Sequence, residues 1–216
     1  FVFGRVALCL VILIFLGRRF MKLSLRPDLG LAHQTSPDKW SQPAGWSGLE
    51  DEVEKSHEGQ FHTGVMYCFA FAVCISMLSY DLIMSLDYRW FSTMFGGWNF
   101  TSFILISWAA LYLMTARLSA DHGLEKYMHR KLYHDLGKLV FGFTVVWGYL
   151  FFAQLMVIWY GNLSHESGYL ITRIHNPTWS AYSWTAAVLV FLIPFVIGLG
   201  KVRKMYPKRH GVIVFI

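Results

Sequence analysis

The chain has few of the residues that bind metal ions and clusters. Its 216 residues include only three cysteines, Cys9, Cys68 and Cys74, with no Cys-x-x-Cys pair and no spacing typical of a zinc or iron–sulfur site. All three lie inside apolar stretches, where cysteine is most simply a small core residue. We therefore predict no metal site on this chain.

Histidines that face one another inside apolar stretches, which a membrane-embedded haem b needs, are also lacking. His62 and His134 lie at the ends of such stretches, and the other seven histidines lie in the polar segments or the tail. A haem held between the helices of this chain is therefore not expected.

Charge is scarce as well, because 15% of the residues are charged whereas 55% are hydrophobic and 18% are aromatic. The apolar residues gather in five stretches, each long enough to cross a bilayer as a helix, and a sixth begins near the end of the sequence. The five are Phe1 to Leu16, His62 to Leu86, Trp98 to Ala116, Leu139 to Tyr160 and Tyr182 to Gly200, and the sixth starts at Val212. The sequence therefore predicts an all-α, polytopic transmembrane helix bundle with five spans and the start of a sixth.

The basic residues predict the orientation of this bundle. Of the 19 lysines and arginines, 16 lie in the first and third connections and the tail, whereas the second and fourth connections hold only Arg89 and Arg173. By the positive-inside rule, segments 17–59 and 117–138 and the tail from 201 are cytoplasmic, and segments 88–98 and 161–181 lie on the outer side. The net charge of +6 is then explained by loops that face anionic lipid, and no nucleic-acid partner follows from it.

Within this plan, residues 1–216 form a single transmembrane helical domain that we interpret as the interior portion of a longer chain. Pro27, Pro37 and Pro43 predict that segment 17–59 is mostly an irregular cytoplasmic loop, with Leu49 to Gly59 as a candidate surface helix. Pro194 is expected to kink the fifth span, which membrane helices tolerate.

Asp81 is the one carboxylate that lies well inside a predicted span. An isolated charge at that depth costs at least a few kcal/mol, so its side chain must face protein, water or a partner. Regular helical spacing would place Met77 and Ser85 on the same flank and turn Tyr80 elsewhere. Two interpretations remain open: a group that takes up and releases protons, or a residue that packs helices together. Arg5 is expected to snorkel or pair, and we assign it no role.

A second group of polar residues lies at predicted cytoplasmic helix ends. His134 and Asp135 precede the fourth span and His62 starts the second, so a cluster of these three would accept protons between about pH 5 and 8. Such an entrance would lead inward past Tyr149 and Gln154. The alternative is that Asp135 caps its helix and pairs with Lys138, while the histidines meet lipid headgroups.

Gln154 itself is predicted to be buried in the fourth span and must find a hydrogen-bond partner. Another helix is the commoner partner, and a quinone carbonyl is the alternative. Tyr80 and Trp159 are the further side chains that we consider as quinone or polar contacts.

Four segments together resemble a known family. They are Asp81 to Leu86 (DLIMSL), Arg89 to Gly96 (RWFSTMFG), His134 to Lys138 (HDLGK) and Ile158 to Leu163 (IWYGNL). They resemble the NrfD-like (polysulfide-reductase-type) integral membrane subunits of bacterial alternative complex III, of the ActF type. The resemblance covers about residues 1 to 200, and it implies a protein with about ten membrane helices in the bacterial inner membrane.

The resemblance also implies a function. Such a subunit belongs to a quinol-oxidising complex that passes electrons through iron–sulfur and haem c subunits to a periplasmic carrier, and it binds no redox cofactor itself. Quinone or menaquinone remains a candidate ligand, although a paralogous membrane subunit is the stronger candidate for the quinol site. Asp81, His134 and Asp135 would then belong to a proton route or a structural polar network. A secondary transporter and a purely structural membrane anchor are the alternatives, and the lack of a charged residue at the midplane of the four complete spans weakens the transporter.

Overall fold

The computed structural model describes residues 1–87, 89–121 and 130–200. All regular structure in these residues is helical and none is a strand, which confirms the all-α prediction. The chain divides into two compact units, Phe1–Asp81 and Leu82–Ile216, and each is described here by itself. The prediction of a single domain stays a prediction.

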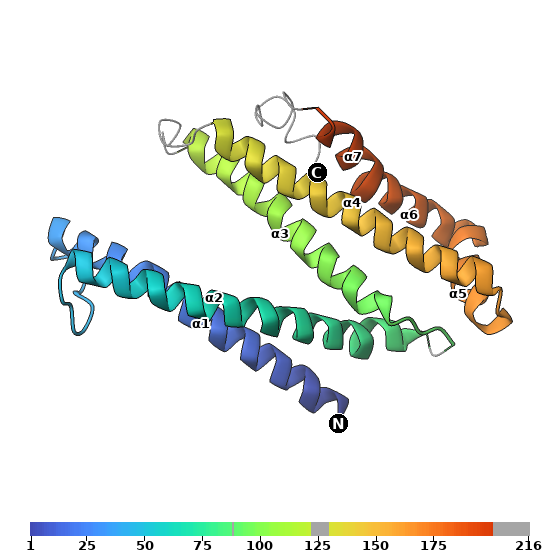
Figure 1. Ribbon diagram of the computed structural model, residues 1–216, viewed down its shortest axis with the longest axis horizontal. Helices are drawn as coiled ribbons and strands as arrows, with labels where there is room; N and C mark the ends of the chain where they lie inside the picture. The colour runs from blue at the N-terminus through green and yellow to red at the C-terminus, as the bar shows by residue number, and fades with distance from the viewer. Residues whose placement is uncertain (88, 122–129, 201–216) are drawn as a thin grey trace. The chain divides into compact units, whose positions relative to one another are not determined.

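The first unit is a helical hairpin of α1 (Val2–Thr35) and α2 (Leu49–Leu78), which lie side by side in Figure 1. Ion pairs join the start of α1 to the end of the α2 segment and the second half of α1 to the start of α2, so the two helices are antiparallel. Cys9 and Cys74 are buried where the helices meet, as predicted, whereas Cys68 is exposed on α2 and the prediction of a core position is wrong for it.

The expected irregular loop over 17–59 is largely wrong. α1 continues through Pro27 to Thr35, and α2 begins at Leu49, as the alternative for that segment allowed. Packing between the helices outweighs the cost of about 3 kcal/mol that proline carries inside a helix. The 36–48 connection also packs on α1, because any Cβ at Gly30 would collide with the ring of Trp46.

The regular α-helix of α2 does not last to its end. It passes into a π turn, η1 (Ser79–Ile83), and a 3-10 turn, η2 (Met84–Leu86). The hydroxyls of Ser76 and Ser79 donate to the carbonyls of Ala72 and Ile75, four residues back, a bond that slightly destabilises and often bends a helix. Because a π turn holds more residues than an α turn, the α-helical spacing predicted around Asp81 is wrong there.

In the described part of the second unit, six helical segments follow η2. They are α3 (Met94–Asp121), α4 (Arg130–Gly161), α5 (Ser164–His175), α6 (Pro177–Ala187), the π turn η4 (Val188–Leu192) and α7 (Ile193–Gly198). α4 packs against α3 around Leu105, Val140 and Trp147, and η4 and α7 also contact it. The π turn ends at Leu192, two residues before Pro194, which has no N–H to donate to the preceding turn. The predicted kink of this helix stays a prediction.

Four helices in the described part of the chain are long and apolar enough to cross a membrane. They are Leu49–Leu86, Met94–Leu118, Lys131–Gly161 and Pro177–Gly198. The predicted span Phe1 to Leu16 lies in α1, which is not among the four, so the count of five stays a prediction. The predicted sixth start, at Val212, lies outside the described residues.

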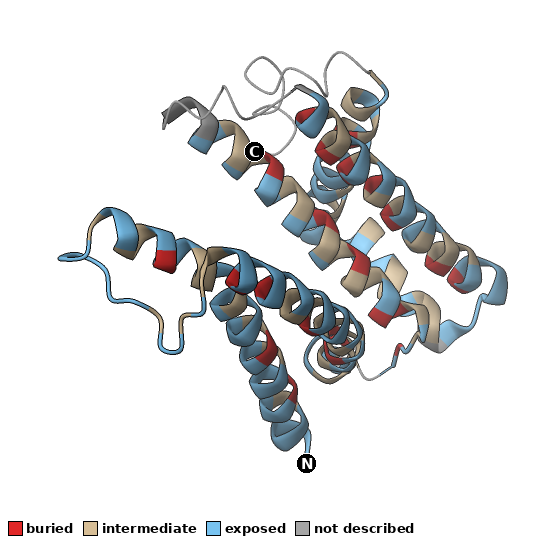
Figure 2. Ribbon diagram, turned by 60° about the vertical axis from the view of Figure 1, so that its left-hand side comes forward, coloured by how far each residue is buried: buried red, intermediate tan, exposed pale blue. Residues whose placement is uncertain are grey.

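The helices of both units expose much apolar surface, such as Phe69 at 73% and Val157 at 63% (Figure 2). Only 6% to 22% of the residues in the four apolar windows are buried inside the protein. Such surface is unfavourable in water and favourable against lipid or further helices. The chain is therefore a multi-pass, all-helical membrane protein.

Candidate functional site

Asp81 pairs with Arg5. The Nη2 atom of Arg5 lies 2.7 Å from Oδ1 of Asp81, and the exposed fractions of the two side chains are 45% and 15%. The pair joins α1 to the π turn η1, so the expectation that Asp81 faces protein or another partner is confirmed. Sequence reasoning left Arg5 without a role, because a snorkelling arginine and a paired one have the same sequence pattern.

The π turn gives this pair an unusual setting. π turns are rare and occur frequently at functional sites, because the extra residue opens the helix backbone and redirects side chains. Tyr80, the neighbour proposed as a polar contact, is half-buried on the same turn. The five residues of η1 therefore include the carboxylate of the ion pair and a phenol on a non-α backbone.

Gln154 lines a cavity in the second unit. Its side chain is 8% exposed, and its amide donates only a long bond of 3.4 Å to the carbonyl of Leu150 on its own helix. The predicted bond to another helix is therefore not what the described residues show. The amide instead faces a cavity of about 260 Å³, whose lining also includes Trp90, Thr93 and Glu166.

His134 and Asp135 lie inside α4, not before it. α4 begins at Arg130, so the prediction that Asp135 caps the helix is wrong, whereas its pair with Lys138 is confirmed at 3.0 Å. The helix extends this far because Tyr133 and Leu136 are buried against Tyr112 of α3. His134 is half-buried beside them.

The predicted proton-route residues are spread along their helices. Within the first unit, His62 and Asp81 are 19 positions apart on one helix, roughly 28 Å at 1.5 Å per residue. The same separation divides Asp135 from Gln154 on α4. The cluster of His62 with His134 and Asp135 would join residues of the two units, so it stays a prediction.

Tyr149 and Trp159 point away from the second unit. Their exposed fractions are 66% and 69%, so neither meets Gln154 inside the described fold. Both lie on α4, where exposed aromatic side chains suit contact with lipid or with another helix.

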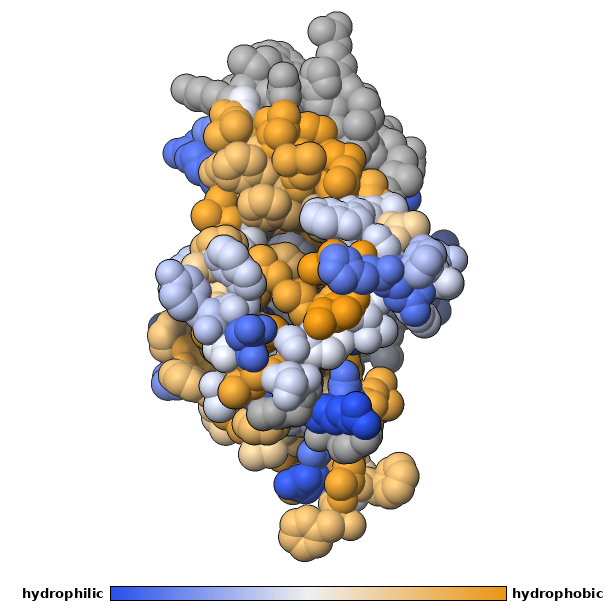
Figure 3. Space-filling model, turned by 90° about the vertical axis from the view of Figure 1, so that its right-hand side faces the viewer, coloured by the Kyte–Doolittle hydropathy of each residue, from blue (hydrophilic) through white to orange (hydrophobic). Residues whose placement is uncertain are grey.

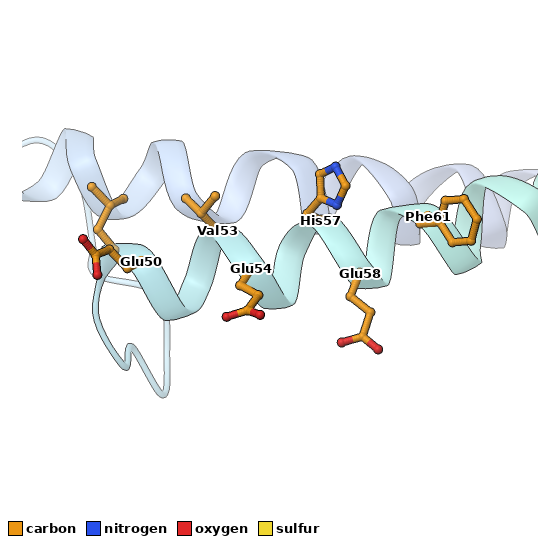
Figure 4. Close-up of a pocket in the computed structure, with 7 residues that line it drawn as sticks. Glu50, Val53, Glu54, His57, Glu58 and Phe61 are labelled. Atoms are coloured by element: carbon orange, nitrogen blue, oxygen red, sulfur yellow. The ribbon is translucent and has the colours of Figure 1, made fainter.

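The first turns of α2 carry an exposed stripe that combines acidic and apolar residues. Figure 4 shows it on one helix, with Glu54 and Glu58 pointing to one side and His57 to another. Val53 and Phe61 in this stripe are 49% and 65% exposed. The residues of this exposed surface are Leu49, Glu50, Val53, Glu54, His57, Glu58 and Phe61. We call this set the α2 stripe.

Sequence reasoning missed an aromatic pocket in the second unit. Trp90 and Tyr169 stack with their ring centroids 3.9 Å apart, and the guanidinium of Arg173 lies 3.5 Å above the Tyr169 ring. Burial raises the pKa of Tyr169, while the charge of Arg173 opposes that rise and the charge of Asp87 adds to it. The sequence feature that could have predicted this pocket is Arg173, the single lysine or arginine in a connection rich in aromatic residues. We used Arg173 only to predict the orientation of the chain.

No group of three or more histidine, cysteine, aspartate or glutamate side chains within residues 1–87, 89–121 and 130–200 is arranged to hold a metal ion. Comparison of the sequence with models of known families finds no match, and comparison with curated proteins finds none either.

Proposed function

We propose that this chain is an integral membrane subunit of a quinol-oxidising electron-transfer complex of the alternative-complex-III type, in the bacterial inner membrane. In this role it contributes a polar, proton-conducting network and a scaffold, and it carries no redox centre. Iron–sulfur clusters and haem c belong to partner subunits, and a paralogous membrane subunit is a further partner.

One observation carries the proposal. Asp81 and Arg5 place opposite charges 2.7 Å apart at a π turn near the end of an apolar helix. Ionisable groups at such positions are costly, and they commonly mark proton relays or ion pathways. The same Asp81 begins the segment that resembles the quinol-oxidising family, so the charge pair and the resemblance coincide at one residue.

Two further features support a role inside a complex. The apolar faces of the four candidate spans are largely uncovered by the chain's own helices, and the α2 stripe exposes Val53 and Phe61 beside acidic side chains. Surfaces of this kind suit other subunits as well as lipid. In the proposed orientation the α2 stripe faces the cytoplasm and the 88–98 and 161–181 segments face the periplasm.

The second candidate is a purely structural membrane anchor. The same ion pair supports this role, because the Arg5–Asp81 bond joins α1 to the end of the α2 segment without any proton transfer. An anchoring role needs only two opposite charges at positions 5 and 81, whereas a proton role needs the carboxylate at position 81.

A charge exchange separates the two candidates. The variants are Asp81→Asn, Arg5→Gln and the double variant Arg5→Asp with Asp81→Arg, each in the full complex reconstituted in liposomes. The proton role predicts that the double variant assembles normally, since the pair is restored, but loses quinol oxidation or its proton coupling by at least about tenfold. Recovery of full turnover and coupling in the double variant would leave only the anchor.

A further inference from the structure

The aromatic pocket of the second unit lies at a membrane surface. It occupies about 420 Å³ between the segment from Ile83 to Trp90, the start of α3, helix α5 and helix α6. Consecutive spans cross in opposite directions, so the two connections beside it, 87–93 and 162–176, lie at the same surface of the membrane. Figure 3, viewed from the side on which α5 lies in Figure 1, shows hydrophilic side chains next to apolar ones.

On one side of the pocket the side chains of Trp90, Tyr169 and Arg173 stack on one another. Because Trp90 covers one face of the Tyr169 ring at 3.9 Å, Arg173 at 3.5 Å must cover the other face. Trp90 is only 4% exposed and is held edge-on by Phe95, with centroids 5.3 Å apart. This packing fixes the position of the Arg173 guanidinium, whose Nη1 also donates to the Tyr169 carbonyl at 3.0 Å.

Two opposite charges line the pocket without neutralising each other. Asp87 accepts a bond of 3.3 Å from the backbone N–H of Arg89, and Arg173 donates to its own helix, but no ion pair joins Asp87 to Arg173 in the described part of the chain. The remaining N–H groups of Arg173 have no hydrogen-bond partner among the described residues. The pocket therefore presents a carboxylate and a guanidinium that are both able to bind a ligand.

The lining of the pocket includes exposed apolar side chains. Leu86 and Trp179 line it with 82% and 57% of their surfaces exposed, and Ile83 lies beside them. The lining also includes Ser183 and the exposed Thr172, whose hydroxyl donates to the Gly168 carbonyl at 2.8 Å. The volume falls in the range of ordinary small-molecule sites, roughly 300–1,000 Å³.

We propose that this pocket binds the zwitterionic headgroup of an aminophospholipid, phosphatidylethanolamine, with its phosphate on Arg173 and its ammonium on Asp87. A guanidinium is the preferred partner of phosphate, and a carboxylate accepts from the three N–H groups of an ammonium. A purely anionic headgroup would meet repulsion from Asp87, and a neutral quinol would leave both charges unmatched. The acyl chains would leave the pocket past Leu86 and Trp179.

The test uses the full chain, in its native complex where it assembles into one, purified in mild detergent and delipidated. Vesicles of phosphatidylethanolamine or of phosphatidylglycerol are added, and the lipid retained per protein is measured by mass spectrometry. The variants are Arg173→Gln and Asp87→Asn, and the matched control is Arg117→Gln, an exposed arginine at the other end of α3. Melting midpoints in lipid-free detergent establish that each variant is folded.

The proposal predicts that the native chain retains phosphatidylethanolamine in preference to phosphatidylglycerol. Each pocket variant should retain roughly tenfold less of it, since one charge-assisted bond is lost, whereas Arg117→Gln should retain the native amount. The variant Arg173→Lys keeps a cation for the phosphate and should retain an intermediate amount. Equal retention in all variants, equal retention of phosphatidylglycerol, or co-purification of a quinone that Arg173→Gln removes would each overturn the proposal.

Discussion

At the scale of single residues, the buried carboxylate of Glu52 is held by hydrogen bonds from Arg26 and Ser47. Its side chain is 3% exposed, and it accepts bonds from Nε and Nη2 of Arg26 at 2.5 and 3.0 Å and from the hydroxyl of Ser47 at 3.3 Å. Arg26 also donates to the carbonyl of Ala44, so the same guanidinium holds the 36–48 connection against both helices.

The variant Glu52→Gln should therefore destabilise the α1–α2 hairpin. Glu52 is buried, whereas 38% of the Arg26 side chain is exposed, so glutamine keeps the packing but loses the charge that Arg26 pairs with, and we expect a lower free energy of unfolding. Thermal unfolding in detergent measures the change. Glu54→Gln, an exposed neighbour in the α2 stripe, is the control and should melt like the native chain; an unchanged midpoint for Glu52→Gln would show that the pair does not stabilise the hairpin.

The sequence predicted the need of Asp81 for a partner but not the partner itself. Burying an unpaired charge is costly at any position, so the sequence alone predicts that Asp81 needs a partner. Arg5 lies 76 positions away, and only the antiparallel packing of α1 and α2 brings it to Asp81. Gln154 gives the opposite case, because its predicted partner on another helix is replaced by its own backbone and a cavity.

At the scale of helices, two glycines of α4 form a natural comparison. A Cβ on Gly148 would collide with the ring of Phe191 in η4, whereas a Cβ on Gly142 would meet nothing within 4 Å. Gly148→Ala should therefore push η4 away from α4 and cost about 1–3 kcal/mol. Gly142→Ala should be neutral or stabilising by up to about 1 kcal/mol, because alanine favours a helix over glycine.

Thermal unfolding of both glycine variants measures this difference. The packing of η4 on α4 predicts a lower midpoint for Gly148→Ala than for Gly142→Ala. A reversed order would mean that Phe191 rotates away freely and that the close approach contributes no stability.

The sequence predicted the helices whose extent follows from the length of an apolar stretch. It did not predict helix ends that depend on packing against another helix. The four candidate spans confirm stretches that were recognised from composition alone. The extension of α1 past Pro27 and of α4 back to Arg130 depends on contacts with Glu52 and Tyr112, which local propensity does not contain. The π turns arise from Ser79 and Pro194, whose effect on a helix depends on the neighbouring turns.

At the scale of the whole molecule, the testable property is the orientation of its connections. Sixteen basic residues against two predict that the α1–α2 connection faces the cytoplasm and the α4–α5 connection faces the periplasm. In a Cys68→Ser background, which removes the exposed native thiol, cysteines replace Ser41 and Ser164, both exposed. Only Ser164→Cys should react with a membrane-impermeant thiol reagent in intact cells whose outer membrane is permeabilised, and both should react after lysis.

The opposite labelling pattern would reverse the proposed topology. Protection of both positions before lysis would contradict an outer location for the α4–α5 connection. In either case the proposed periplasmic electron carrier would no longer share a side with the 161–181 segment.

The ion pair of the first unit has a consequence for how the protein enters the membrane during synthesis. Arg5 leaves the ribosome 76 residues before Asp81, so within the predicted first span it has no carboxylate partner from α2 until then, and an unpaired arginine inside an inserting helix is costly, about 3 kcal/mol at the helix centre. Once Asp81 has been made, the two charges can be neutralised against each other, and α1 and α2 can move into the lipid together as a hairpin. The first helix of this chain therefore has a thermodynamic reason to wait at the translocon for the second.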